Sequence, residues 1–332
     1  MAKTYSTLSA FFIDIADAIR EKTGDTASII ADDFPDAIRE RLQVIPPPDP
    51  YLTFSSPSSF TLKVNDATKH WDGTLEYSTD TSTWSTWDGT TTLSSATSGS
   101  DNVLYLRGTG NTVITGSKQN YKWILTGSDI ACIGNIENLL DYATVESGAH
   151  PTMAIHCYQN MFRDCTSLTR APALPATTLA SNCYRSIFNR CTSLTQAPAL
   201  PATTLAGSCY YYMFRGCTSL TQAPALPATT LASNCYDNMF QGCTSLTQVP
   251  ALPAAMLMSS CYYNMFQGCT KIKLSSTQTG EYTIAYRIPS SGTGTIATNA
   301  LFNMFTSTGG TFKGTPNINT TYYLSNTNTV VR

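Results

Sequence analysis

The sequence is poor in charged residues. Only 13% of its 332 residues are Asp, Glu, Lys or Arg, about half of the usual share, whereas hydrophobic residues make up 42%. Disordered chains combine low hydrophobicity with a high net charge, so this composition excludes global disorder. The formal net charge of −2 excludes a strongly basic protein that binds nucleic acid over its whole surface. At roughly 150 residues per domain, the length suggests about two domains, or three small ones.

Long apolar runs are also missing. A membrane-spanning helix needs about 18 or more apolar residues in a row, and no such run occurs. Near the start of the chain, Asp14 and Asp17 interrupt the first apolar run after four residues, whereas a secretory signal needs about 7–15. We therefore expect no membrane insertion, no export signal, and folding in a reducing cytosol.

Signatures of catalysis are absent as well. The motifs GxSxG, HExxH, GxGxxG and the phosphate-binding loop do not occur in a suitable context. Asp164 and Asp237, the acids of the repeat region described below, lie 73 positions apart, whereas a glycosidase needs two carboxylates about 5–9 Å apart. Asp72, Asp80 and Asp88 suit either calcium binding or the commoner role of capping turns. We expect no enzymatic activity, no cofactor and no metal.

What the sequence does contain is a 26-residue repeat over 157–274. Each repeat begins with CYxxMFxxC, or with Ile in place of Met, and most continue with TSLTxAPALPATTLA. Apolar residues at offsets 0, 1, 4, 5 and 8 predict a short helix, and the prolines that follow favour an extended segment. One helix and one strand per coil is the layout of a leucine-rich-repeat solenoid, whose coils bury their apolar faces by stacking on one another.

Ten of the eleven cysteines fall in two columns of this repeat. The first column is Cys157, Cys183, Cys209, Cys235 and Cys261, and the second is Cys165, Cys191, Cys217, Cys243 and Cys269. Eight residues separate the two within a repeat, or about 12 Å along a helix, which exceeds the ~7 Å that a disulfide allows. Zinc sites need closer spacings such as CxxC. We predict stacked, buried thiols, and bridges between coils remain an alternative.

Two kinds of position alternate in the repeat. Phe162, Met161, Leu168 and their counterparts recur in every coil, which predicts stacked interior columns. The pairs after CY and after MF vary, and we expect them to face solvent. The candidate ligand-binding residues among them are Arg185, Tyr211, Tyr212, Arg215, Asn238, Gln241, Tyr263 and Asn264. Relaxed constraint on an exposed face is the alternative. Over 157–274 seven basic and two acidic residues give +5, which favours approach to an anionic surface.

The residues quoted above carry a family resemblance. The string ALPATTLAxxCYxxMFxGCTSLTxAPALPATTLA resembles the bacterial surface-protein (BspA-type) leucine-rich repeats, in the form found in gut-associated bacteriophage genomes. The segment 132–142, CIGNIENLLDY, resembles the opening coil of those proteins, and 301–326 resembles their closing coil. The segment 14–42 resembles an N-terminal part of bacteriophage tail and fibre proteins.

Residues 1–44 contain two amphipathic stripes, which predict two short helices. The apolar residues are Leu8, Phe11, Phe12, Ile15 and Ile19 in the first, and Phe34, Ile38 and Leu42 in the second. Helices this short bury little area alone, so these residues are candidates for attachment and oligomerisation, and we favour a homo-trimer. An ordinary helix pair packed on the next domain is the alternative.

Residues 51–128 change to short alternating segments, which predict a small Ig-like β-sandwich. All four tryptophans fall here: Trp71, Trp84, Trp87 and Trp123. Packing in the core is the commoner use of tryptophan, and a platform for stacking sugars is the alternative.

The predicted fold is therefore a mixed α and β, multidomain protein. Its parts are a helical attachment segment, a Pro-rich linker, a β-sandwich, a leucine-rich-repeat solenoid and a capping coil with a tail, at 1–44, 45–50, 51–128, 129–276 and 277–332.

The resemblance implies a non-catalytic, tail-fibre-like adhesin. It would be assembled in the host cytoplasm, attached to other virion (tail) proteins, and would bind a host-surface glycan or protein. Nucleic acid is not an expected partner. The alternatives are a bacterial cell-surface adhesin with the same repeats and a structural virion decoration protein without a receptor.

Overall fold

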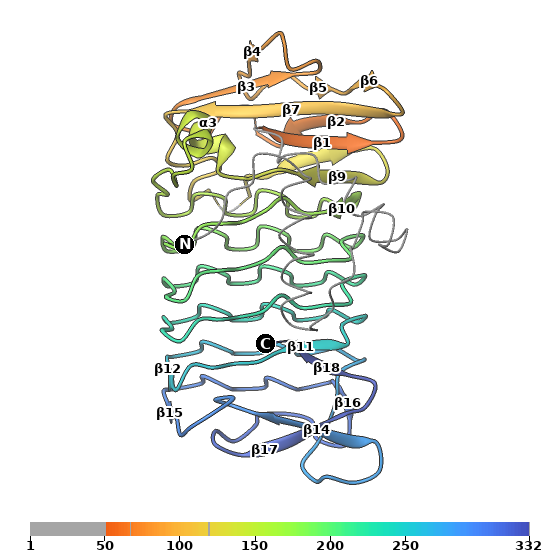
Figure 1. Ribbon diagram of the computed structural model, residues 1–332, viewed down its shortest axis with the longest axis vertical. Helices are drawn as coiled ribbons and strands as arrows, with labels where there is room; N and C mark the ends of the chain where they lie inside the picture. The colour runs from red at the N-terminus through yellow and green to blue at the C-terminus, as the bar shows by residue number, and fades with distance from the viewer. Residues whose placement is uncertain (1–50, 67, 119, 332) are drawn as a thin grey trace, which may run out of the picture. The chain divides into compact units, whose positions relative to one another are not determined.

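The computed structural model describes residues 51–66, 68–118 and 120–331. The expected N-terminal helices and linker lie outside the described residues, and so do the eight candidate attachment residues. The described part belongs to one compact unit, Asp49–Arg332. It is mostly β and contains a single α-helix among the described residues, α3 at Asn138–Glu146 (Figure 1).

Two sheets occupy the first part of this unit. The larger has seven strands in the order β10-β9-β1-β7-β3-β4, with β6 also paired to β7. These strands are β1 Leu52–Ser56, β3 Thr74–Ser78, β4 Ser85–Thr86, β6 Ala96–Ser98, β7 Asp101–Thr109, β9 Ile130–Ile133 and β10 Leu168–Arg170. The smaller sheet has the order β5-β2-β8, with β2 at Thr61–Val64, β5 at Leu93–Ser94 and β8 at Trp123–Thr126. Because β10 belongs to the first repeat, the larger sheet crosses the boundary expected at residue 128.

Tryptophan fills the core of these sheets. Trp71, Trp87 and Trp123 are buried, and the Trp87 ring lies 5.1 Å from that of Trp71 and 5.4 Å from that of Trp123. Core packing is thus confirmed for three of the four. Trp84 is half-exposed, and the guanidinium carbon of Arg107 lies 4.0 Å from its ring centre, so that residue already covers a face of the ring.

Asp80 and Asp88 cap the turns that follow them, the commoner of the two roles expected, whereas Asp72 bonds to backbone N–H groups about 40 residues further along the chain. Asp80 accepts hydrogen bonds from the backbone N–H groups of Ser82 and Thr83 at 2.9 and 2.8 Å. Asp88 does the same for Thr90 and Thr91, and Asp72 for Thr112 and Val113.

Helix α3 packs on β7 at a glycine. A Cβ atom at Gly108 would lie 1.7 Å from the carbonyl oxygen of Leu139 in the helix, so only glycine permits this approach. Asn111 holds the same contact, because its amide donates to the carbonyl groups of Thr74 and Leu139 at 2.7 and 3.0 Å.

The helix expected in each repeat is not present, and this prediction was wrong. Residues 157–165 form a run of turns in which backbone N–H groups alternate between two kinds of acceptor. Met161 donates to Tyr158 at 3.2 Å, three residues back, whereas Phe162 donates to Ile187 of the next repeat at 2.9 Å. Every fourth residue has a positive φ, as at Asn160 (61°) and Asp164 (63°). Half of the hydrogen bonds therefore join neighbouring coils, which an isolated helix could not provide.

Identical side chains stack from repeat to repeat, as predicted. The ring of Tyr158 lies 5.6 Å from that of Tyr184 and nearly parallel to it, and Phe162 stacks on Phe188 at 5.8 Å. Both columns continue through Tyr262 and Phe266. Each ring thus covers its counterpart in the next repeat, so the interior is shared along the whole stack.

All eleven cysteines are free and buried, as predicted. The thiols of the second column bond to backbone oxygen: Cys191 Sγ donates to the Phe162 carbonyl oxygen at 3.0 Å, and Cys217 does the same at Phe188 at 3.1 Å. Burial raises the pKa of both thiols well above the ordinary range. These side chains therefore act as small hydrophobic residues that also satisfy a carbonyl group of the preceding coil.

The extended side of the repeats is a narrow parallel ladder. Single bridges join Arg170 to Gln196, Gln196 to Gln222, and Gln222 to Gln248. The prolines of the APALP segment lack a backbone N–H, which keeps this ladder short.

Both ends of the stack are covered. At the start, Trp123 donates its backbone N–H to Met161 at 2.8 Å, in place of a preceding coil. At the other end 300–305 continues the register, since Phe266 donates to Met304 at 3.0 Å. The last strands form a four-stranded sheet, β14-β17-β13-β16, and two parallel pairs, β12-β15 and β11-β18. They are β11 Gln248–Pro250, β12 Met256–Leu257, β13 Lys273–Ser275, β14 Tyr282–Arg287, β15 Thr295–Ile296, β16 Gly309–Gly310, β17 Thr321–Ser325 and β18 Thr329–Val331.

Candidate functional site

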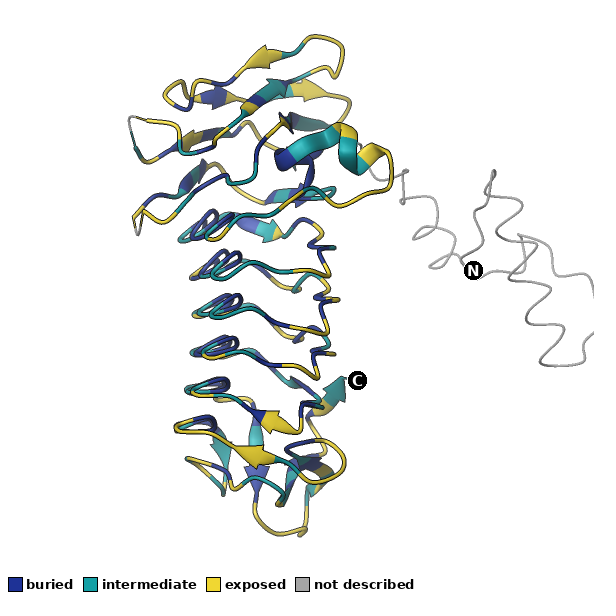
Figure 2. Ribbon diagram, turned by 90° about the vertical axis from the view of Figure 1, so that its left-hand side faces the viewer, coloured by how far each residue is buried: buried dark blue, intermediate teal, exposed yellow. Residues whose placement is uncertain are grey.

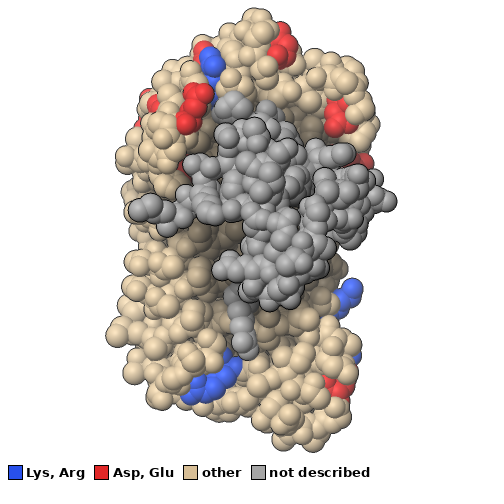
Figure 3. Space-filling view, in the orientation of Figure 1, with Lys and Arg blue, Asp and Glu red and all other residues tan. Residues whose placement is uncertain are grey.

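The variable residues of the repeats lie together along the turns. We define the turn face as the second, third, sixth and seventh residues after the first cysteine of each repeat, which in the first repeat are Gln159, Asn160, Arg163 and Asp164. Figure 2 shows these turns above one another along one edge of the stack. Charged side chains are sparse on the uncovered surface of the face that Figure 3 shows.

The turn face exposes the candidate residues to different degrees. Arg215 is exposed. Six others are half-buried: Arg185, Tyr211, Tyr212, Gln241, Tyr263 and Asn264. Asn238 is buried at 4% exposure, so the expectation that it faces solvent was wrong. The same expectation was wrong for five other variable residues of the turns, which are also buried: Gln159, Asn160, Ser186, Asn189 and Asp237. The third residue of each turn lies between its counterparts in the neighbouring coils, and Asn238 also donates a side-chain hydrogen bond to its neighbour Asp237.

Arginine and tyrosine pack against each other on the turn face, once between the second and third repeats and once within the third. The guanidinium carbon of Arg185 lies 4.6 Å from the centre of the Tyr211 ring, and that of Arg215 lies 5.1 Å from the Tyr212 ring. The two tyrosine rings meet edge to face at 4.1 Å. Gln241 fixes Arg215 further, because Arg215 Nε donates to Gln241 Oε1 at 2.6 Å. These side chains are therefore held in place by contacts within the protein.

A cavity of about 180 Å³ opens between the first three repeats on this face. Its lining residues are Gln159, Asn160, Arg163, Arg185, Ser186, Asn189, Tyr212 and Arg215. Three of them are arginines, and no aspartate or glutamate is among them. A shallower hollow beside it is lined by Arg190, Arg215, Gly216, Gln241 and Gly242.

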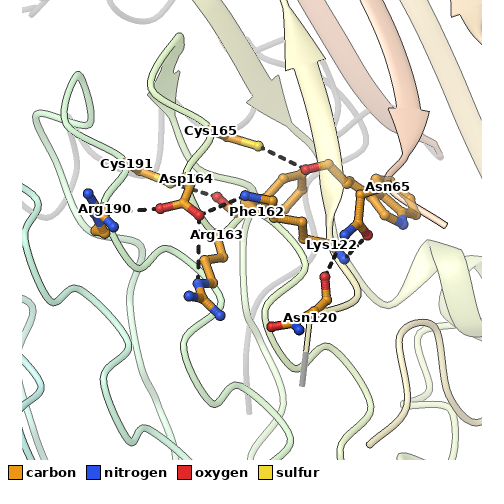
Figure 4. Close-up of polar contacts among 10 residues, drawn as sticks. Asn65, Asn120, Lys122, Phe162, Arg163, Asp164, Cys165, Arg190 and Cys191 are labelled. Atoms are coloured by element: carbon orange, nitrogen blue, oxygen red, sulfur yellow. Dashed lines mark hydrogen bonds and ion pairs between the residues drawn. The ribbon is translucent and has the colours of Figure 1, made fainter. Parts of the chain in front are cut away.

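The acidic residue beside Arg163 and Arg190 is already paired (Figure 4). Asp164 accepts a hydrogen bond from Lys122 Nζ at 2.7 Å, and the Nε atoms of Arg163 and Arg190 lie 3.7 and 3.6 Å from its oxygens. Three cations therefore share one carboxylate, which leaves a surplus of positive charge. No sequence pattern pointed to Lys122, which precedes Asp164 by 42 residues and reaches it through the fold.

The second acid of the turn face, Asp237, is 7% exposed. Burial raises the pKa of Asp237 to about 6, and the hydrogen bond from Asn238 and the charge of Arg185 oppose this shift. The carboxyl group is therefore poorly solvated when it is ionised.

Other parts of the described chain show fewer features of a binding or catalytic site. A cavity of about 550 Å³ lies between the last repeats and the closing strands and is lined by Leu226, Pro253, Tyr286, Arg287, Val330 and other residues. Its residues come from distant segments, so the sequence did not point to it. Within 51–66, 68–118 and 120–331, no three His, Cys, Asp or Glu residues gather as metal ligands. No helix in the same ranges is long and apolar enough to cross a membrane.

Comparisons with protein-family models, with curated proteins and with solved structures found no match.

Proposed function

We propose that this protein is a virion-attached, tail-fibre-like adhesin that binds a receptor on the host-cell surface without chemical catalysis. We also propose that its repeats form a solenoid related to the BspA-type leucine-rich repeats, with turns in place of helices, and that residues 51–128 are an Ig-like spacer. The receptor would be bound on the turn face.

One observation carries this proposal: the repeats differ mainly where the turn face lies. Tyr210, Tyr236 and the other interior residues recur and stack, whereas the second residue of the turn is Arg185, Tyr211 and Asp237 in successive repeats. A rigid stack that presents a different polar or aromatic side chain at each level is suited to recognition. Tyrosine and arginine are also the residues that most often dominate binding surfaces.

The N-terminal residues would supply attachment. Leu8, Phe11, Phe12 and their partners in the second stripe are proposed to bind other tail proteins or further copies of the chain, most favourably as a trimer. Deletion of 1–50 should then abolish oligomerisation, measured by light scattering, and leave cell binding per protomer intact. A monomeric full-length chain would contradict this part of the proposal.

Cell binding tests the recognition surface. We expect the labelled full chain to attach to a panel of gut bacteria, and the combined change of Tyr211, Tyr212 and Arg215 to Ala to abolish attachment. The matched control changes Arg170, Gln196 and Gln222 to Ala, because these residues are exposed on the extended side. If the first variant attaches as well as the wild type, the turn face is not the receptor site.

Two further outcomes separate the alternatives. A chain that attaches to no cell but remains bound to particles would be a decoration protein. Detection of the protein on bacteria that carry no bacteriophage would favour a cell-surface adhesin.

A further inference from the structure

We propose that the cavity between Arg163, Arg185 and Arg215 binds the anionic group of an acidic sugar. This inference deepens the proposed function, on which it rests, because it names the chemical class of the receptor. The shared chemistry is a carboxylate or sulfate carried on a sugar ring.

The cavity brings together arginines from three successive repeats. Arg163 follows Phe162 in the first repeat, Arg185 follows Tyr184 in the second, and Arg215 follows Phe214 in the third. All three line the same cavity. No aspartate or glutamate is among the lining residues. Asp237 interacts with Arg185 from outside the lining, and Asp164 already has three cationic neighbours.

Most N–H groups of these arginines are available to a ligand. Among the described residues, Arg163 has only an ion pair at 3.7 Å, which is too long for a hydrogen bond. Arg185 donates one long bond, from NH1 to Asn182 at 3.4 Å. Arg215 uses Nε for Gln241, and its two terminal nitrogens have no partner among the described residues. Guanidinium groups of this kind bind carboxylate or sulfate oxygens through two parallel hydrogen bonds.

Two buried polar atoms of the lining residues also lack a hydrogen bond. They are Arg163 Nε, which has only the 3.7 Å ion pair with Asp164, and Asn189 Oδ1. Asn189 as a whole is 5% exposed. Buried polar groups without a hydrogen bond are rare in native proteins and call for a water molecule or a ligand. Here they belong to residues that line one polar cavity.

The arginines are also held in position. Arg185 lies over Tyr211 and Arg215 lies over Tyr212, so little side-chain freedom remains to be lost on binding. Binding therefore loses less side-chain conformational entropy than it would with flexible arginines on an open surface.

The size and lining of the cavity favour a sugar over a larger anion. A volume of about 180 Å³ corresponds to roughly six water molecules at ~30 Å³ each, which suits one charged group and part of a ring. Gln159, Ser186 and Asn189 supply amide and hydroxyl groups at the same place, and such groups orient sugar hydroxyls. A nucleic acid would need a longer basic stripe along its backbone.

Titration calorimetry on the full chain tests this inference. The probes are sialyllactose and a hyaluronan tetrasaccharide for carboxylates, a heparin tetrasaccharide for sulfates, maltotetraose as a neutral sugar, and a short DNA duplex. We expect binding of at least one acidic sugar, weaker binding at higher salt, and no binding of maltotetraose. Comparison of the affinities for the carboxylated and the sulfated sugars shows which anion the cavity prefers.

Variants locate the binding. R185Q and R215Q should each weaken it by about ten-fold or more, as expected for the loss of a hydrogen bond to a charged group. R170Q removes the same charge from outside the cavity and should leave affinity unchanged. N189D places a carboxylate in the cavity and should abolish binding. Circular dichroism and thermal melting of each variant show that it is folded.

Several results would overturn the inference. They are binding to none of the acidic sugars, equal binding to DNA or maltotetraose, an R185Q variant with wild-type affinity, or an equal loss in R170Q. Its failure can be told apart from that of the proposed function. If the wild type attaches to cells but no acidic sugar binds or competes, the adhesin proposal is supported and the acidic-sugar site is contradicted. If acidic sugars bind but the protein attaches to no cell, the adhesin proposal is contradicted.

Discussion

Arg185 in the second repeat and Tyr211 in the third form a cation–π pair, with the guanidinium carbon 4.6 Å from the ring centre. A second cation–π pair, between Arg215 and Tyr212 at 5.1 Å, lies within the third repeat. The coil spacing that stacks the buried rings thus also brings Arg185 onto Tyr211. The proposed recognition and the stability of the turns can each be tested by separate substitutions.

A first prediction concerns the stability of the turn positions that have a positive φ. Arg190 has φ of 63° and an exposed side chain, whereas the equivalent residues in the next three repeats are Gly216, Gly242 and Gly268. R190G should therefore raise the free energy of unfolding by about 0.5–1 kcal/mol, less whatever the 3.6 Å ion pair with Asp164 contributes. Urea denaturation measures this difference.

The matched control is R170G. Arg170 lies in β10 and is absent from the residues with positive φ, so glycine there should destabilise by about 0.5–1 kcal/mol. Loss of stability in both variants would contradict the argument.

Asp237 should make stability depend on pH. Because its pKa is raised to about 6 from 3.8, the folded protein binds more protons than the unfolded chain between these values, and stability falls as pH rises from about 4 to 6. D237N should remove this dependence and stabilise the protein by roughly 1–2 kcal/mol at pH 7.5, after allowance for partial solvent screening. At pH 3.5 it should have little effect. Melting temperatures across this range provide the measurement.

The control with the opposite sign is Asp80. Backbone N–H groups of Thr83 and Ser82 lower the pKa of Asp80 to about 2, so its stabilising effect is present above pH 4 and is lost as pH falls through 2. D80N should remove that effect at neutral pH.

For Asp237 the contradicting result is a D237N variant that is less stable than the wild type at pH 7.5. It would show that hydrogen bonds and nearby charges stabilise the ionised Asp237 carboxylate more than burial destabilises it.

The buried thiols should be chemically silent in the native state. All eleven cysteines are buried, and burial raises the pKa of Cys235 and Cys243 to about 12, so almost no thiolate exists at pH 8. A thiol reagent such as DTNB should label none of them in the folded protein and all of them in guanidinium. Addition of a reductant should leave the melting temperature unchanged. Rapid labelling, or a melting temperature that falls on reduction, would contradict the free, buried assignment.

The repeat explains which features were predictable. Phe162, Phe188 and Cys191 occupy positions that recur every 26 residues, so their burial follows from the sequence alone. The helix was predicted wrongly because offsets 0, 1, 4, 5 and 8 fit both a helix and a turn of period four. The distinguishing signal was the recurrence of Asn160 and Asn238, or of glycine at Gly216, at positions that need a positive φ.

The arrangement of the candidate site was less predictable. Its side chains were chosen correctly as variable residues, but their exposure depends on how coils stack, and Asn238 proved to be buried. Lys122 and the shared carboxylate of Asp164 come together only through the contact between the first repeat and the strands before it. Sequence spacing does not encode such contacts between distant segments.

Gly108 should be indispensable for packing α3 on β7. Because a Cβ atom there would lie 1.7 Å from the Leu139 carbonyl oxygen, G108A must move the helix or the strand, at a cost of about 3 kcal/mol or more. G207A is the matched control, since the atoms nearest to its added Cβ lie at 3.8 and 3.9 Å, and it should stay within about 0.5 kcal/mol of the wild type. Denaturant unfolding compares the two variants by their midpoints, provided that the dependence of the free energy of unfolding on denaturant concentration is unchanged. Equal midpoints would mean that α3 does not approach β7 this closely.

Finally, the repeats should depend on the strands that precede them. A fragment of 129–332 lacks β1, which pairs with β9, and lacks Trp123, whose N–H bonds to Met161 and whose carbonyl accepts from Cys165. The first coil would then expose the ring of Phe162, and uncapped repeat arrays are poorly soluble. We expect this fragment to aggregate or to melt without cooperativity, whereas 51–332 should melt cooperatively. Limited proteolysis and circular dichroism of both fragments measure the difference. A 129–332 fragment as stable as 51–332 would show that the repeats need no cap from the preceding sheets.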